Sequence, residues 1–427
     1  MVLTSKELKI PVAGLITFLV LFLILTRTAL EKIVSQAGVI DDLIILLISG
    51  YVLFRLFETG FLWFQKFSFF AILLFFWMVW GVYQNELPSS NLLQILIYYK
   101  IIIMFLFFHL MPLRHKETCL KAAIYSIYLV AVLAVLFALF ELFFRDIHSS
   151  VFVNRRSDRG INGMYLTSIW GHRVGFADFL ILSLIVLVSY SKRVWWLSVR
   201  LAPISVLFGF LVMSSSRKEI VLGTVILFVS AFSKMDKFQK WFGYLLLLFT
   251  ILAIGFGLWT STQSASRSLL TEDYIRWQMV AAGSNALVDS NLLGTGVGTF
   301  GSQLSREYTE IYSSTGLFAN RPVDSAPIFD IGYLSLIVEL GFGFLLVVAM
   351  IGQHLMFKKI IKVSWFDVKT CLFMMLITFV ILGLFTPIFT NWVGMIIAAL
   401  YGIQTAPSSF GIKIHTKICP KDDRAKP

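Results

Sequence analysis

The chain has 427 residues, of which 58% are hydrophobic and 14% are charged. A soluble protein carries about a quarter charged residues, so this composition, with a mean hydropathy of +0.83, excludes an ordinary soluble domain. The formal net charge is +12, but the lysines are dispersed over many short polar segments, which gives no support for binding nucleic acid.

Apolar stretches long enough to cross a bilayer follow one another along the chain. A span needs about 20 predominantly apolar residues, so we predict an all-α, polytopic integral membrane protein with about twelve transmembrane helices in one domain, residues 1–427. The first stretch lacks a small-residue cleavage site and is followed by further spans, so we expect a retained anchor and not a signal peptide. The spans are expected near residues 10–28, 38–57, 67–84, 92–111, 119–144, 174–191, 199–214, 218–233, 241–260, 328–351, 366–385 and 388–405.

The lysines predict the orientation of these spans. They fall almost entirely in alternate polar segments, beginning with Lys6 and Lys9 and ending with Lys413 to Lys426. Cytoplasmic loops retain positive charge, so we expect both termini in the cytoplasm. Two segments then face outward: residues 145–173, and a large loop over residues 261–327 between the ninth and tenth spans. Neither contains Lys.

The outer segments carry arginine instead, which the orientation does not explain. Planar guanidinium groups bind phosphate and carboxylate through two parallel hydrogen bonds. Arg173, Arg217 and Arg276 stand on three different outer segments, and we expect them to converge on one diphosphate. The alternative is that each Arg reaches the lipid headgroups or pairs with a nearby acid. Arg159, in the first outer segment, is a secondary candidate.

The large outer loop is predicted to contain a helix followed by a turn. An amphipathic helix is expected over about residues 272–288, with Thr271 as its N-cap. Four of its residues fall on one stripe at helical spacing: Ile275, Met279, Ala282 and Ala286. The glycines of the following sequence GTGVGTFG, residues 294–301, end this helix. They lack the Lys-Ser/Thr of a P-loop, so they favour a tight turn over a phosphate cradle.

A second polar turn joins two predicted spans. The sequence SSSRKE, residues 214–219, ends one span with three hydroxyl groups and opens the next with three charged groups. Such a turn can cap a helix and bind an anion at its N-terminus. The alternative is an ordinary turn at the membrane interface.

Acidic residues and a histidine on the outer side supply candidates for proton transfer. Asp324 and Asp330 flank the predicted start of the tenth span, and Glu339 lies further inside it. An intramembrane carboxylate is a functional candidate by default, although pairing with an Arg would explain any of these three at least as well. His172 stands beside Arg173.

The sequence predicts no metal and no cofactor. HExxH, DxD, GxSxG and P-loop motifs are absent, which argues against a metal-dependent or nucleotide-driven enzyme. Cys119, Cys371 and Cys419 have no paired spacing, so neither a disulfide framework nor a zinc site is indicated.

Several of these segments together resemble the O-antigen ligase/polymerase family of bacterial envelope glycosyltransferases. The likeness rests on Arg276-Trp277 followed by LLGTGVGTF, on DIGYL from Asp330 with ELG from Glu339, on SSSRKEI around Arg217 and on HRVGFADF around Arg173. It covers roughly residues 150–350 in detail and the whole chain in its order of spans.

The resemblance implies a substrate and a set of roles. Members of this family use sugar donors linked to undecaprenyl diphosphate in the bacterial inner membrane and need no metal. Carried over by position, Arg217 and Arg276 would bind the donor diphosphate, with Arg173 assisting. Ligases of the family commonly carry a His near the position that Asp330 occupies here. Asp330 is therefore our expected general base, and Asp324 and His172 are the next candidates for this role.

The stretch DSAPIFDIGYL, residues 324–334, contains no His where the ligases commonly carry one. This difference favours the polymerase branch of the family. The expected reaction is the metal-independent, inverting polymerisation of undecaprenyl-diphosphate-linked oligosaccharide repeat units at the periplasmic face. Donor and acceptor would both be lipid-linked glycans, and the resemblance also allows for a chain-length regulator protein as a partner. The alternatives are a ligase that transfers the glycan to lipid A-core or protein, and a transporter or flippase of lipid-linked sugars.

Overall fold

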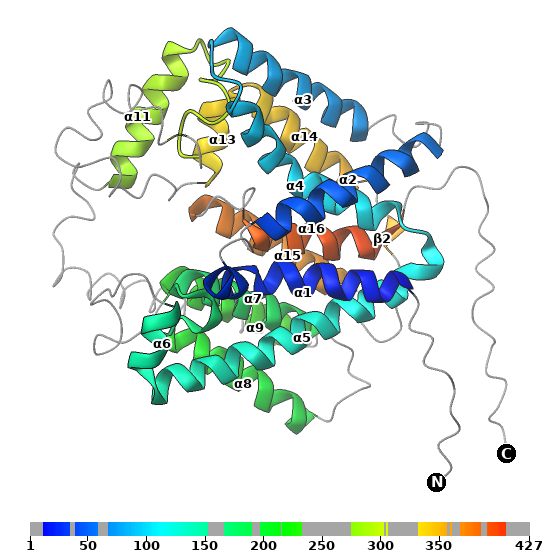
Figure 1. Cartoon of the computed structure of the whole chain (residues 1–427), viewed down its shortest axis with the longest axis vertical. Coiled ribbons are helices and arrows are strands. Elements are labelled where there is room, and N and C mark those ends of the chain that lie inside the picture. The colour runs from blue at the N-terminus through cyan, green and yellow to red at the C-terminus, as the bar shows by residue number, and fades with distance from the viewer. Residues whose placement is uncertain are drawn as a thin grey trace.

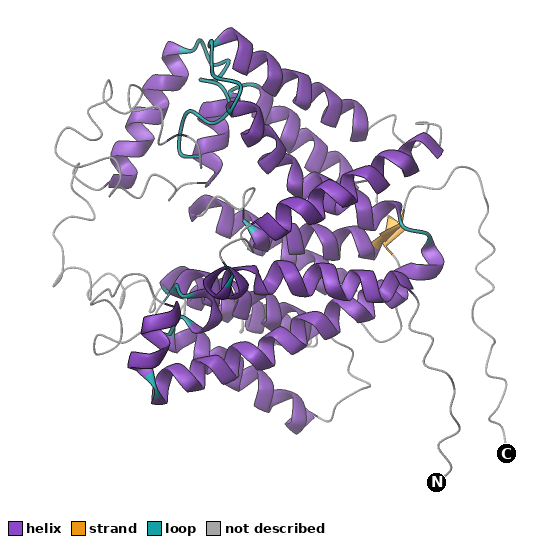
Figure 2. Ribbon diagram, viewed as in Figure 1, coloured by secondary structure: helices purple, strands orange, loops and turns teal. Residues whose placement is uncertain are grey.

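The computed structural model describes residues 12–34, 39–58, 67–152, 166–189, 197–214, 216–232, 275–302, 305, 332–356, 359–360, 368–385 and 391–406. Helices joined by loops and turns make up this part of the chain, together with one antiparallel pair of two-residue strands, β1 (Lys359–Ile360) and β2 (Thr405–Ala406) (Figure 2). The predicted all-α fold class is confirmed for these residues.

Most of the long helices run from one side of the molecule to the other (Figure 1). The start of α1 and the end of α16 lie on one side, which we call the inner side; the end of α5, helix α6 and helix α11 lie toward the opposite, outer side. The helices are α1 (Val12–Ile33), α2 (Ile40–Glu58), α3 (Phe67–Gln84), α4 (Asn91–Leu110), α5 (Leu113–Phe143), α6 (Arg145–Phe152), the 3₁₀ helix η3 (Ser168–Trp170), α7 (Arg173–Ser189), α8 (Leu197–Met213), α9 (Arg217–Phe232), α11 (Ile275–Asp289), α13 (Gly332–Leu340), α14 (Gly343–Met356), α15 (Val368–Phe385) and α16 (Trp392–Gln404).

The helices agree with the predicted spans wherever the chain is described, with one exception over residues 328–351. Three of them, α1, α4 and α5, are long and apolar enough to cross a membrane. Helices α3, α8, α14, α15 and α16 are apolar but contribute shorter segments. The ninth predicted span, 241–260, lies outside the described residues, so the total of about twelve spans stays a prediction.

The exception is a break in the predicted span 328–351, which forms two helices, α13 and α14. Gly341 between them has a φ of +49°, and a Cβ at this position would overlap the backbone at Leu292 and Leu293. The N–H of Phe342 donates to the carbonyl of Leu292, 3.0 Å away. The loop after α11 therefore docks into the break, and this contact from a distant part of the chain ends α13.

Helix α7 is enclosed by other helices along most of its length. It packs against α5, α8, α9 and α15, and every residue from Gly175 to Val186 is buried. A helix that is apolar on all sides belongs inside a bundle and not at its surface. The start of α7 is thereby held in a fixed position relative to its neighbours.

Lys116 joins the inner ends of three helices. Its ammonium group is buried and donates to the carbonyl oxygens of His109 and Gly402, both 3.0 Å away, and of Thr405. These carbonyls belong to the last turns of α4 and α16 and the residue after α16, where no further backbone N–H is available within the helix. A cation at this position also complements the negative ends of both helix dipoles.

Replacing Lys116 by Met should lower the thermal stability of the purified protein markedly. Each buried carbonyl left without its donor costs about 1–3 kcal/mol. Lys121→Met is the matched control, because Lys121 lies on the same helix, is exposed and pairs with Glu117 one turn earlier, 3.1 Å away. Equal melting temperatures for the two variants would show that Lys116 does not hold these helix ends together.

Candidate functional site

The three arginines singled out by the sequence lie at the starts of helices. Arg173 opens α7 and Arg217 opens α9, and these two helices pack against each other. The N–H of Leu166, just before η3, donates to the carbonyl of Met213 at the end of α8, 3.3 Å away, so α7 and α9 begin on the same, outer side.

Arg276 is the second residue of α11. One end of α11 joins the loop that packs on α13, and the other end, which begins at Ile275, lies toward the same outer side of the molecule (Figure 1). The side chains of Arg217 and Arg276 lie outside the described residues, unlike that of Arg173, which is partly buried. The structure therefore places three helix starts on one side, and the convergence of the guanidinium groups stays a prediction.

His172 caps the N-terminus of α7. Its Nδ1 accepts a hydrogen bond from the backbone N–H of Gly175, 2.9 Å away, in the manner of an N-cap side chain. A Cβ at Gly175 would overlap the imidazole, so glycine leaves room for the ring. Packing around the ring and the charge of Lys32 lower the pKa of His172 below its ordinary value. The lone pair of Nδ1 is occupied, which argues against His172 as the general base.

A buried carboxylate holds the turn before α7. Glu141, near the outer end of α5, accepts from the backbone N–H groups of Thr167 and Ser168, both 2.8 Å away, and from the Thr167 hydroxyl, 3.1 Å away. His148 of α6 donates from Nε2 to the Ser168 carbonyl, 3.0 Å away. Ser168 has a φ of 50°, a conformation that needs such support in a residue other than glycine. Glu141 thus fixes η3 and the start of α7.

The SSSRKE turn is held together by bonds among its own side chains at the start of α9. Ser216 donates its hydroxyl to the Glu219 carboxylate, and its N–H donates to Ser214 Oγ, 3.4 Å away. Lys218 Nζ lies 3.2 Å from Glu219 Oε1. The order S-x-x-E is that of a capping box, in which a hydroxyl and a carboxylate serve the free N–H groups of the first turn. The structure shows the hydroxyl of Ser216 bound to the Glu219 carboxylate, and both capping of α9 and anion binding by Arg217 stay predictions.

A second carboxyl group lies next to this turn. Asp178, in the second turn of α7, is 1% exposed and is close enough to Glu219 for a hydrogen bond between the two carboxyl groups. Its Oδ1 has no hydrogen-bond partner. Two buried carboxylates this close repel each other, and one shared proton removes the repulsion. Arg173 lies five residues before Asp178 in α7, and Arg217 lies two residues before Glu219 in α9. Each arginine is therefore close in sequence to one member of this buried acid pair.

The glycine-rich loop after α11 forms a tight turn against α13. The N–H groups of Thr295 and Gly296 donate to the carbonyls of Val338 and Glu339, at 2.9 and 3.1 Å. Four glycines of the loop have positive φ: Gly294, Gly296, Gly298 and Gly301. At Gly294 a Cβ would overlap the backbone of α13, so only glycine allows this approach.

The side chain of Glu339, in α13, binds the backbone of this loop. Its carboxylate accepts from the Tyr98 hydroxyl, 2.7 Å away, and from the backbone N–H of Phe300, 3.1 Å away. The side chain is 2% exposed. Backbone N–H groups of a glycine loop often cradle a phosphate, but here at least one of them faces a carboxylate of the chain itself. Glu339 is thus a structural anchor for the loop that ends α11.

Glu339→Ala should destabilise the protein more than Glu339→Gln. Alanine leaves the Tyr98 hydroxyl and the Phe300 N–H buried without an acceptor, at about 1–3 kcal/mol each, whereas glutamine keeps one carbonyl oxygen. Melting temperature and proteolysis between α11 and α13 would measure the effect. Glu117→Ala, at an exposed carboxylate paired with Lys121, is the control. Wild-type melting and cleavage in Glu339→Ala would remove the anchoring role.

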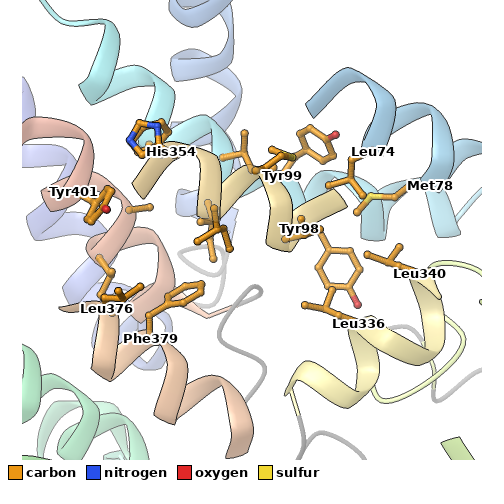
Figure 3. Close-up of a pocket in the computed structure, with 18 residues that line it drawn as sticks. Leu74, Met78, Tyr98, Tyr99, Leu336, Leu340, His354, Leu376, Phe379 and Tyr401 are labelled. Carbon is orange, nitrogen blue, oxygen red and sulfur yellow. The ribbon is translucent and has the colours of Figure 1, made fainter. Parts of the chain in front are cut away.

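An apolar cavity of about 150 Å³ lies between α3, α4, α13, α14, α15 and α16. Figure 3 shows Tyr98 beside Leu336 and Leu340 at one end, and His354 and Tyr401 at the other. The lining is almost entirely hydrocarbon and aromatic. Such a cavity suits an acyl or isoprenoid chain better than a sugar.

Charged groups also meet inside the helices. Asp41, at the start of α2, accepts from Arg27 of α1 and Lys100 of α4, both at 2.9 Å, and Lys100 also pairs with Asp42. Asp41 is almost fully buried, and Lys100 is the tenth of the 20 residues of α4. A network of this kind inside a bundle locks three helices together or marks a path for charged groups.

Three of the predicted site residues lie outside the described residues: Arg159, Asp324 and Asp330. Within the described ranges no three His, Cys, Asp or Glu side chains come close enough to hold a metal ion.

Sequence reasoning missed the pairing of Asp178 with Glu219. Asp178 lies within an apolar run, and a single acid in such a run gives no indication of its partner. The S-x-x-E order of residues 216–219 was a readable signal for a helix start, since this pattern places a carboxylate over the first turn. The chain matches no known protein-family model and no curated protein, so no relative assigns a role to any of these residues.

Proposed function

We propose that this protein is a membrane glycosyltransferase that polymerises undecaprenyl-diphosphate-linked oligosaccharide repeat units at the periplasmic face of the bacterial inner membrane. The observation that carries the proposal is that α7 and α9, which pack against each other, begin with Arg173 and Arg217 on the outer side, toward which α11 with Arg276 also lies. The positive ends of the helix dipoles add partial positive charge to that of the arginines, which favours a diphosphate.

The chemistry that this site would support is direct displacement. The growing glycan on its lipid diphosphate is the donor, and a sugar hydroxyl of the next lipid-linked repeat is the acceptor. The hydroxyl oxygen attacks the anomeric carbon, the carbon–oxygen bond to the diphosphate breaks with inversion, and the hydroxyl proton passes to a carboxylate. The arginines stabilise the negative charge that develops on the leaving diphosphate.

The apolar cavity supports a lipid-linked substrate. It lies between helices that reach the outer side, and its lining offers contact to a hydrocarbon chain. An isoprenoid tail held among the helices would leave its diphosphate at the outer ends of the bundle. Arg173 and Arg217 lie at the outer ends of α7 and α9, where such a diphosphate would be.

Arg276→Ala and Arg217→Ala should each abolish long-chain polymer while the protein still inserts into the membrane. Each Arg–phosphate contact contributes about 1.5–3 kcal/mol, or roughly 10- to 100-fold in binding. The glycan banding pattern of a deletion strain that carries each variant measures the effect. Arg114→Ala is the control, since Arg114 is exposed on the inner side and contacts only His115 in the described region. Normal chain lengths in both test variants would refute the diphosphate role.

Asp330→Asn should reduce the rate of polymerisation by about 10²–10⁴-fold, the usual contribution of a general base. Purified protein with lipid-linked repeat units provides the measurement. Asp324→Asn is compared in parallel, because it removes the neighbouring carboxylate and keeps the same charge change. Full activity in Asp330→Asn together with loss in Asp324→Asn would move the base to Asp324.

The ligase alternative differs in the product that accumulates. A strain without the protein would carry lipopolysaccharide with one repeat if the protein is a polymerase. It would carry bare core and accumulated lipid-linked polymer if the protein is a ligase.

Transport of lipid-linked sugars is the second candidate, and the charged groups buried among the helices favour it. Asp178 with Glu219, and Asp41 with Arg27 and Lys100, are the kind of intramembrane groups that couple transport to ion movement. Reconstituted vesicles distinguish the two activities. Elongation of lipid-linked repeats without an accessory enzyme supports the polymerase, and movement across the bilayer without elongation supports the transporter.

A further inference from the structure

His172 has a fixed tautomer because of the group that it faces. The backbone N–H of Gly175 can only donate, so Nδ1 of His172, 2.9 Å away, is the acceptor. In an uncharged imidazole the other nitrogen, Nε2, then carries the proton. A charged ring would direct an N–H at the N–H of Gly175 and break the cap of α7.

The surroundings of His172 favour the uncharged ring. Although the side chain is exposed, the atoms packed around the ring, together with Lys32 at the end of α1, lower the pKa of His172. Arg173 adds a further positive charge next in the chain. The carboxylate of Glu141 is engaged on η3 by two backbone N–H groups, and His148 lies 3.8 Å from it. At neutral pH the ring is therefore uncharged.

We propose that His172 donates its Nε2–H to a diphosphate oxygen of the lipid-linked donor, beside the charge of Arg173. This inference rests on the proposed function and gives His172 a binding role in place of proton transfer. The Nε2–H of the uncharged imidazole would fix the orientation of a diphosphate oxygen. The guanidinium group of Arg173 would supply the positive charge that attracts the diphosphate. The position of His172 as the cap of the 17-residue helix α7 keeps this direction constant.

Two substitutions separate the cap from the donor. In His172→Asn the side-chain oxygen can still accept from Gly175, but no donor remains at the position of Nε2. We expect the melting temperature of the wild type and a KM for the lipid-linked donor raised about 10- to 100-fold. His172→Ala should lose both stability and affinity. His115→Asn, on the inner side, is the control.

A second measurement reads the tautomer without using activity. In ¹⁵N-histidine-labelled full-length protein in detergent micelles, the His172 signals are assigned from their absence in His172→Asn. We expect protonated Nε2 and unprotonated Nδ1 at neutral pH, and a shift of Nε2 when farnesyl diphosphate is added. Lys32→Gln should raise the pH at which the ring becomes charged.

The outcomes are distinct from those that test the polymerase. A protonated Nδ1 at neutral pH, no response of Nε2 to farnesyl diphosphate, or a wild-type KM in His172→Asn would each overturn the donor role. A response to farnesyl diphosphate in a protein that elongates no glycan would sustain the donor role and reject the polymerase.

Discussion

The ends of helices inside an apolar bundle are the constraint on which the rest of this structure depends. Each helix leaves N–H groups at its start and carbonyl groups at its end without partners in the helix, and little water is present to serve them. Polar side chains meet this need at several ends. Lys116 serves the inner ends of α4 and α16, and His172 caps α7.

The same constraint explains why buried carboxylates fix the backbone segments on the outer side. Glu141 fixes the turn before α7 and Glu339 fixes the loop after α11, each through backbone N–H groups that would otherwise be unpaired. The elements that carry the arginines are therefore anchored by carboxylates at other positions.

The helices could be predicted from the sequence because hydrophobicity is a local property. The ranges predicted for α2, α3 and α4 agree with the structure to within two residues. The break at Gly341 could not be predicted, because it depends on contact with Leu292, which lies 49 residues earlier. Lys116 and Asp178 also have partners far along the chain, on α16 and α9, and a single sequence does not pair distant positions. Arg173 and Arg217 were found because they stand against the charge trend of the loops, and their placement at adjacent helix starts required the structure.

The short length of α16 has a consequence for where the outer chemistry takes place. With 13 residues it is about 20 Å long, whereas the hydrocarbon layer is about 30 Å thick. If its last turn beside Lys116 lies at the inner boundary, its first turn stops well short of the outer boundary. Trp392 in that turn stacks on Trp170 of η3, with ring centroids 6.0 Å apart. With α16 placed in this way, the segment that leads into α7 would lie below the plane of the lipid headgroups, in surroundings of lower dielectric constant, where every charge acts on its neighbours more strongly than it would in water.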